Sequence, residues 1–251
     1  ALAMTIGRGE FGWLNVILLA CAGAGLGFFI LHETRTPSPL IKLAMFRDPA
    51  LTASVIMSAL VSTVIMATLV VGPFYLAYAL GLNAALVGIV LSAGPLVAAL
   101  TGVPAGRVTD RFGAHRMTLV GLAGMTSGSL ALSLAPASVG ILGYVGPIAV
   151  LTAGYALFQT ANNTAVMTDI SPDQRGVISG MLNLSRNLGL VTGASVMGAV
   201  FAFAAGAADT TTAHPDAVAA GMRITFLVAA ALLIAALALH SRFSRRESRF
   251  P

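Results

Sequence analysis

An arginine lies deep inside an apolar segment near the C-terminal end of the chain. Arg186 follows Val177 by roughly nine residues, which is about 13 Å along a helix. An arginine at such a depth in a bilayer costs roughly 2.5 kcal/mol or more unless it is paired or hydrated. Asn183 lies on the same helical face and can share its water. The pattern indicates either a clamp onto the backbone carbonyls of another helix or a polar group in an aqueous cavity.

A second set of polar side chains occurs in the preceding apolar segment. Tyr155, Gln159 and Asn162 recur at spacings of four and three, so they form one stripe on a helix. Such stripes in membrane helices either hold helices together or line a pathway. We favour the pathway, and we expect Tyr155, Gln159, Asn162, Asn183 and Arg186 to line it.

The most specific local pattern is G-x-x-x-D-R-x-G. It runs from Gly106 through Asp110 and Arg111 to Gly113, and Arg116 follows it. Glycines allow a tight reversal of the chain, and Asp110 can cap or complement a helix N-terminus. The arginines suit the level of the lipid headgroups. We therefore expect a short loop here, between two membrane helices.

The helix that contains Arg186 has a predicted start and a predicted packing face. Ser171 and Gln174 fit a capping box, and Pro172 fits the first helical position. The G-x-x-x-G pattern from Gly189 to Gly193 lets another helix approach closely.

The amino-acid composition of the chain is that of a membrane protein. Of the 251 residues, 57% are hydrophobic and only 9% are charged, whereas soluble domains carry about 25% charged residues. The mean hydropathy of +0.90 agrees with this. The net charge of +5 comes from short basic clusters that form no continuous face, so a nucleic-acid partner is excluded. The single cysteine rules out a disulfide framework.

The spacing of charges divides the chain into apolar spans, each of about the 20 residues that one bilayer crossing takes. Turn residues at Gly81–Asn83 and at Pro136–Gly140 split the two longest charge-free runs. We expect seven membrane helices, at roughly 11–31, 50–79, 84–105, 117–135, 140–167, 172–205 and 222–240.

Basic residues occur in alternate connections, which predicts the orientation of the chain. Lysine and arginine collect on the cytoplasmic side of membrane proteins. We expect a multi-pass protein of the cell (inner) membrane with a cytoplasmic C-terminus and an outward-facing start. An outward start without a signal sequence or an initiating methionine predicts that the chain was cut from a longer one. The basic connections are Arg35 to Arg47, Arg107 to Arg116, Arg175, and the tail from Arg242 to Arg249.

The segment from Gly106 to Arg116 resembles the loop signature of the major facilitator superfamily, in the copy that belongs to the second six-helix half. The family usually has two basic residues after the second glycine, where this chain has Ala114 and His115. The resemblance implies that Gly106, Asp110, Arg111, Gly113 and Arg116 form a conformational motif. It also implies that Asp110 latches onto a helix end of the other half.

Two further segments resemble the fourteen-helix drug:proton antiporters of that superfamily. The run from Asn183 to Gly193 is similar to the fifth helix of their second half, and the span that opens at Phe11 is similar to the second of their two added central helices. The resemblance implies an all-α membrane fold in which one extra helix precedes the six-helix C-terminal half of a facilitator. The expected divisions are an extra helix with its linker (1–49), the six-helix half (50–241) and a basic tail (242–251).

The function that the resemblance implies is proton-coupled export of hydrophobic drugs or other small molecules by alternating access. The chain has no aspartate or glutamate at mid-membrane depth, and its four histidines lie in loops or near helix ends. The coupling acids are therefore expected in the N-terminal half. The expected partners are the lipid bilayer, a small-molecule substrate, protons and that missing half.

Two other classes of function compete with export. A membrane-embedded enzyme needs a nucleophile with its base, or a metal set, at depth. The sequence offers neither, so we expect no enzyme and no cofactor. The alternative that stays open is a non-transporting membrane remnant or an interaction subunit.

Overall fold

The structure, a computed structural model, describes residues 17, 48–168, 170–206 and 214–247, with side chains as far as 243. In these residues it contains helices and no strands. Six helical stretches are long and apolar enough to cross a membrane, which confirms the all-α membrane fold. The predicted span at 11–31 lies outside the described part. The elements are α3 (Pro49–Phe74), η2 (Tyr75–Ala79), α4 (Ala84–Leu91), α5 (Ala93–Phe112), α6 (Ala114–Leu134), η3 (Ala137–Val139), α7 (Ile141–Met167), α8 (Pro172–Ala204) and α9 (Pro215–Glu247).

Both predicted bends occur where the turn residues placed them. Asn83 caps α4, because its Oδ1 accepts a hydrogen bond of 3.0 Å from the backbone N–H of Leu86. The other bend is the short η3 helix, after which Gly140 adopts a positive φ of 64°. The membrane helix predicted at 84–105 is divided into α4 and α5 at Ser92. Pro95 explains this break, since it has no N–H to donate to the carbonyl of Leu91.

The predicted loop between α5 and α6 is much shorter than expected. Helix α5 continues from the membrane to Phe112, α6 begins at Ala114, and Gly113 alone makes the turn, with a φ of 88°. Most of the glycine–aspartate–arginine motif is thus helical. Asp110 lies in the last turn of α5 rather than at a helix N-terminus, so the prediction that it caps a helix is wrong.

The boundaries of α8 and α9 differ from those that we predicted from the spacing of charges. Ser171 is the N-cap residue of α8 and Pro172 is its first residue, as predicted, but the side chain of Ser171 makes no capping hydrogen bond. The capping-box prediction is therefore wrong. Helix α9 runs from Pro215 to Glu247, well beyond the predicted 222–240 at both ends. No helix breaker follows Leu239 before Glu247, so the helix continues into the basic tail.

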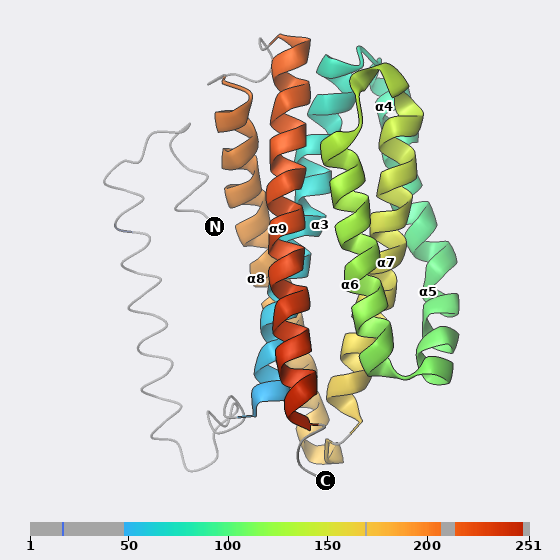
Figure 1. Cartoon of the computed structure of the whole chain (residues 1–251), viewed down its shortest axis with the longest axis vertical. Coiled ribbons are helices and arrows are strands. Elements are labelled where there is room, and N and C mark those ends of the chain that lie inside the picture. Colours follow the sequence, from blue (N-terminus) through green and yellow to red (C-terminus); the bar gives the residue numbers. More distant parts are fainter. Residues whose placement is uncertain (1–16, 18–47, 169, 207–213, 248–251) are drawn as a thin grey trace.

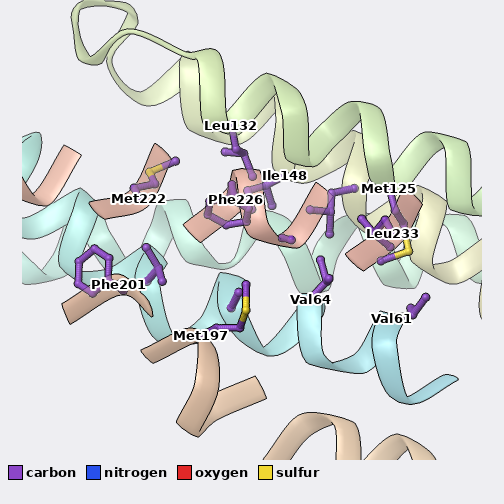
Figure 2. Packing of buried hydrophobic residues seen from close by; sticks show 14 of the residues in the cluster. Val61, Val64, Met125, Leu132, Ile148, Met197, Phe201, Met222, Phe226 and Leu233 are labelled. Atoms are coloured by element: carbon purple, nitrogen blue, oxygen red, sulfur yellow. The ribbon is translucent and has the colours of Figure 1, made fainter. Parts of the chain in front are cut away.

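The core lies where α3, α6, α7, α8 and α9 meet. Figure 2 shows side chains from all five helices converging, with Val64 of α3, Met197 of α8 and Phe226 of α9 among them. These side chains are fully buried. Because lipid tails are as apolar as leucine, such contacts hold helices together mainly by close packing.

Among the described elements, the most extensive helix–helix contacts are those of α3 with α8 and of α6 with α7, and glycines line both seams. A Cβ on Gly193 would stand 2.6 Å from the backbone oxygen of Thr63 in α3. A Cβ on Gly121 would stand 2.5 Å from the backbone nitrogen of Phe158 in α7. The prediction that the G-x-x-x-G pattern brings a second helix close is confirmed, and α3 is that helix.

The charged connections of the described chain gather at one end of the bundle (Figure 1). This end holds the start of α3, the α5–α6 turn, the α7–α8 connection and the end of α9. The opposite end holds the start of α9, with Arg223 two turns inside the helix. The separation agrees with the charge pattern of the sequence. Which end faces the cytoplasm stays a prediction.

Candidate functional site

A polar pocket of about 110 Å³ lies between α3, α7 and α8. It has room for several water molecules, since one water needs about 10–15 Å³ measured in this way. The pocket joins residues from positions far apart in the sequence. Its polar lining consists of Ser58, Ser62, Tyr155, Gln159, Asn163, Ser179, Asn183 and Arg186.

Arg186 is the charged group of this pocket. Its side chain is partly buried, and one Nη donates a hydrogen bond to Oδ1 of Asn183. The phenol of Tyr155, across on α7, lies close enough to interact with the guanidinium. Within the described residues, Arg186 donates no hydrogen bond to the backbone carbonyl of another helix. The geometry therefore favours the cavity interpretation over the clamp.

Four of the five predicted pathway residues line this one pocket. Tyr155 and Gln159 come from α7, and Asn183 and Arg186 come from α8. The structure adds Ser58 and Ser62 of α3, which sequence reasoning missed. Their spacing of four on an apolar helix was the available signal.

Asn162 is placed differently. It is only 2% exposed, and its Nδ2 donates a hydrogen bond of 3.1 Å to Oγ of Ser58 and a longer one of 3.5 Å to the backbone oxygen of Ser54. Asn162 thus braces α7 against α3, and the next residue, Asn163, lines the pocket. Polar contacts of this kind hold membrane helices together.

The chemistry available in the pocket is binding. A guanidinium, three amides, a phenol and three hydroxyls can orient a polar part of a ligand or hold water. No aspartate, glutamate or histidine lines the pocket, and the described chain has no cluster of side chains that could hold a metal ion.

The segment that we predict to be a conformational motif lies away from this pocket, at the charged end. Asp110, Arg107, Arg111 and Arg116 are exposed, and Arg111 stacks over the ring of Phe112 at 5.3 Å. Asp110 forms no ion pair with any described residue. A carboxylate in the last turn of a helix opposes the helix dipole.

The sequence is similar to those of known transporters. The family described as Major Facilitator Superfamily matches residues 1–194. The uncharacterized transporter YebQ of Escherichia coli K12 is 32% identical over 170 residues, which make up 68% of this chain and 37% of that protein. The drug efflux pump JefA of Mycobacterium tuberculosis H37Rv is 27% identical to this chain. The match covers 88% of this chain and 44% of the length of JefA.

A relative that is named for a different substrate is the riboflavin transporter RibZ of Clostridioides difficile 630. It is 23% identical to this chain, and the match covers 87% of this chain and 48% of the length of RibZ. The chain therefore spans less than half of the length of each of these three relatives.

Proposed function

This chain belongs to the major facilitator superfamily, and we propose that it is no enzyme but forms the C-terminal half of a proton-coupled exporter of hydrophobic drugs or other small molecules. In this proposal its tail faces the cytoplasm from the inner membrane. Halves of such transporters rock about a central site, so transport also needs an N-terminal half. The fourteen-helix drug:proton antiporters are the subfamily that we propose.

The observation that carries this proposal is the polar pocket around Arg186. Its lining side chains stand in helices that are otherwise apolar, and exposed Asn183 and Asn163 extend the polar face beyond the pocket. Uncovered amides and a cation at membrane depth are costly in lipid. A second half that encloses a shared aqueous pathway would remove this cost. Tyr155, Gln159, Asn183 and Arg186 would then face the substrate.

The proposed class of substrate rests on the names of related proteins. JefA is a drug efflux pump, and the Stp protein of Mycobacterium tuberculosis H37Rv, 26% identical to this chain over 196 residues, is a multidrug resistance protein. No described aspartate or glutamate is buried in the membrane helices. In this proposal, the acids that drive exchange therefore belong to the N-terminal half.

The experiment that tests the proposal measures the native polypeptide and then its transport. A blot against the C-terminal tail in native membranes is expected to give a band near twice the 25.5 kDa of this chain. Membrane vesicles that contain this polypeptide are expected to extrude a fluorescent drug when a proton gradient is imposed. A band at 25.5 kDa together with absent extrusion would favour the alternative, a non-transporting remnant or interaction subunit.

Replacement of Asp110 by asparagine is expected to shift the balance between the inward-open and outward-open states of the intact transporter. The carboxylate is exposed, unpaired among described residues and opposed to its own helix dipole, so in this proposal its favourable contact lies with the other half. Cysteine probes placed on the two sides of the pathway report the shift as opposite changes in labelling rate.

The matched control for Asp110 is Asp173→Asn. Asp173 is also exposed at the charged end, but it lies in the first turn of α8, where it already complements the dipole of its own helix. Its replacement should leave the labelling rates on both sides unchanged. Equal labelling in Asp110→Asn and the parent protein would remove the latch role from this proposal.

A further inference from the structure

A single arginine occupies the end of the bundle that lies opposite the charged connections. Helices α6 and α9 lie side by side and run in opposite directions, so the last turn of α6 meets the early turns of α9 at this end (Figure 1). Arg223 of α9 is exposed there. Among the described residues of this end, no other lysine or arginine is present. Its positive charge is therefore not part of a general basic surface.

The guanidinium of Arg223 uses only part of its hydrogen-bonding capacity within the bundle. Nε donates a hydrogen bond of 3.1 Å to the backbone oxygen of Ser133, in the last turn of α6. Carbonyls in a last turn have no partner within their own helix, so this bond ties the guanidinium to the end of α6. Arginine has five N–H donors, and those of the two Nη atoms make no hydrogen bond with a described residue. They remain available to an acceptor from outside the described chain.

The described carboxylates do not neutralise this cation. Asp216 is the described acidic residue nearest to Arg223 in sequence, and it lies two turns earlier on α9, roughly 10 Å along the helix axis. Its carboxylate faces His214 instead, at 3.6 Å. No described acidic side chain forms an ion pair with Arg223. An anion is therefore the complementary ligand for this guanidinium.

An apolar groove of about 360 Å³ begins beside the guanidinium, between α6 and α9. Its residues on α9 recur at spacings of three and four, so they form one face of the helix. Leu134 and Leu227 are 70% and 55% exposed, so the groove is open toward the lipid. Leu227 lies one turn farther from the end of the bundle than Arg223, which means that the groove leads from the membrane surface toward the bilayer interior. The groove is lined by Ser133, Leu134, Ala220, Arg223, Ile224 and Leu227.

A cation at the membrane surface with an apolar groove below it has the form of a phospholipid binding site. Planar guanidinium groups bind phosphate with two parallel hydrogen bonds, and an acyl chain fits the groove. Acyl chains gain little by exchanging one apolar surface for another in a bilayer, so the guanidinium must select the lipid by its headgroup. An anionic headgroup leaves its phosphate free for this contact, whereas a zwitterionic one carries an ammonium group that competes for it. Basic pockets between membrane helices bind anionic lipids in this way.

We propose that Arg223 and the groove between α6 and α9 bind one anionic phospholipid, with its phosphate on the guanidinium and one acyl chain along Leu227. The bound lipid connects the end of α6 to α9 at the membrane surface. This site is separate from the pocket around Arg186, which lies between α3, α7 and α8. The proposal therefore does not rest on the proposed function.

The proposal is tested with phosphatidylglycerol that carries a photoreactive diazirine in one acyl chain. A small fraction of this lipid is placed with the protein in nanodiscs of phosphatidylcholine, and the labelled residues are identified by mass spectrometry. Labelling is expected at the groove, around Leu134 and Leu227. Unlabelled phosphatidylglycerol should lower it several-fold, whereas added phosphatidylcholine with the same acyl chains should not. Inorganic phosphate at the same concentration should also leave it unchanged.

Three variants separate the charge of Arg223 from the shape of the groove. Arg223→Gln removes the charge and should lower labelling of the groove several-fold, and Arg223→Lys should retain part of it because the charge remains. Ala220→Phe narrows the groove and leaves the cation in place, since Ala220 is exposed and lines the groove. It should also lower labelling, and it provides the test if Arg223→Gln fails to fold.

The matched control is Arg175→Gln. Arg175 is also exposed, and its Nε likewise donates to a backbone oxygen, that of Ile170 at 3.3 Å, but at the charged end of the bundle. Its replacement should leave labelling of the groove unchanged. Equal labelling by phosphatidylglycerol and phosphatidylcholine probes, or unchanged labelling in Arg223→Gln, would overturn the proposal. Displacement of the lipid by inorganic phosphate alone would show that the site takes a free anion instead.

Discussion

Replacing Arg186 with alanine is expected to lower drug efflux by the intact transporter about tenfold or more, with an unchanged amount of protein in the membrane. Arg186 is the only charged side chain among the described residues that line the pocket. Asn183 accepts a hydrogen bond from its guanidinium, and the phenol of Tyr155 lies close enough to interact with it. Hydrogen bonds to charged groups contribute about 1.5–3 kcal/mol, and about 1.4 kcal/mol corresponds to a factor of ten in rate. The measurement is the initial rate of efflux from energised cells, normalised to the amount of protein.

Two variants separate a role in the pathway from a role in folding. Asn187→Ala changes the exposed neighbour of Arg186 on the same helix, which does not line the pocket, and should leave efflux within about twofold of the parent. Arg186→Lys keeps the charge but loses the planar fork of donors, so its efflux should fall between those of the parent and the alanine variant. Normal efflux in Arg186→Ala would show that the pocket is not on the pathway. Loss of the protein from the membrane would assign Arg186 to packing instead.

The positions of the membrane helices follow from the sequence, but their ends do not. Charge-free runs show where the chain can lie in lipid, and these runs placed six helices that the structure describes. A helix, however, continues until its backbone is broken. Arginines at 107 and 111 ended the predicted span, whereas the backbone of α5 ends only at Gly113. Hydropathy and helix termination are different physical criteria, and they agree only where a breaker lies at the membrane surface.

The polar stripe on α7 shows how much of the pocket the spacing of residues along one helix can predict. Successive residues of a helix are rotated by about 100°, so Asn162 and Asn163 lie on opposite edges of the stripe formed by Tyr155 and Gln159. The sequence identifies this face of the helix. It does not tell which edge packs against α3, because that depends on how closely α3 approaches. The structure settles the question, with Asn162 buried against Ser58 and Asn163 open to the pocket.

The burial of His240 was beyond the reach of sequence reasoning for a related reason. His240 occurs near the end of the last apolar span, a position where side chains commonly meet water or headgroups. Its burial results from the packing of α9 against α6, which brings it onto His115 from a position more than a hundred residues away. A pattern along one chain carries no information about such a pairing.

Replacing Gly189 with alanine is expected to destabilise the α3–α8 seam. A methyl group there would collide with the backbone oxygen of Ala59, and the hydrogen bond of 3.1 Å from Oγ1 of Thr63 to the oxygen of Gly189 depends on the same close approach. Overpacking costs about 1–3 kcal/mol, and a lost hydrogen bond about 1 kcal/mol more. Together these exceed the gain of about 1 kcal/mol that alanine brings to a helix. The thermal midpoint of the purified 251-residue chain, followed by size-exclusion chromatography, should fall by several degrees.

The control on the same helix predicts the opposite sign. No described residue lies within 4 Å of a Cβ built on Gly180, so Gly180→Ala keeps the gain in helix propensity without a collision. Its thermal midpoint should stay unchanged or rise. A general intolerance of α8 to alanine would lower both midpoints, and a loosely packed seam would lower neither. Only close contact between the backbones of α3 and α8 at Gly189 gives a fall in one variant and none in the other.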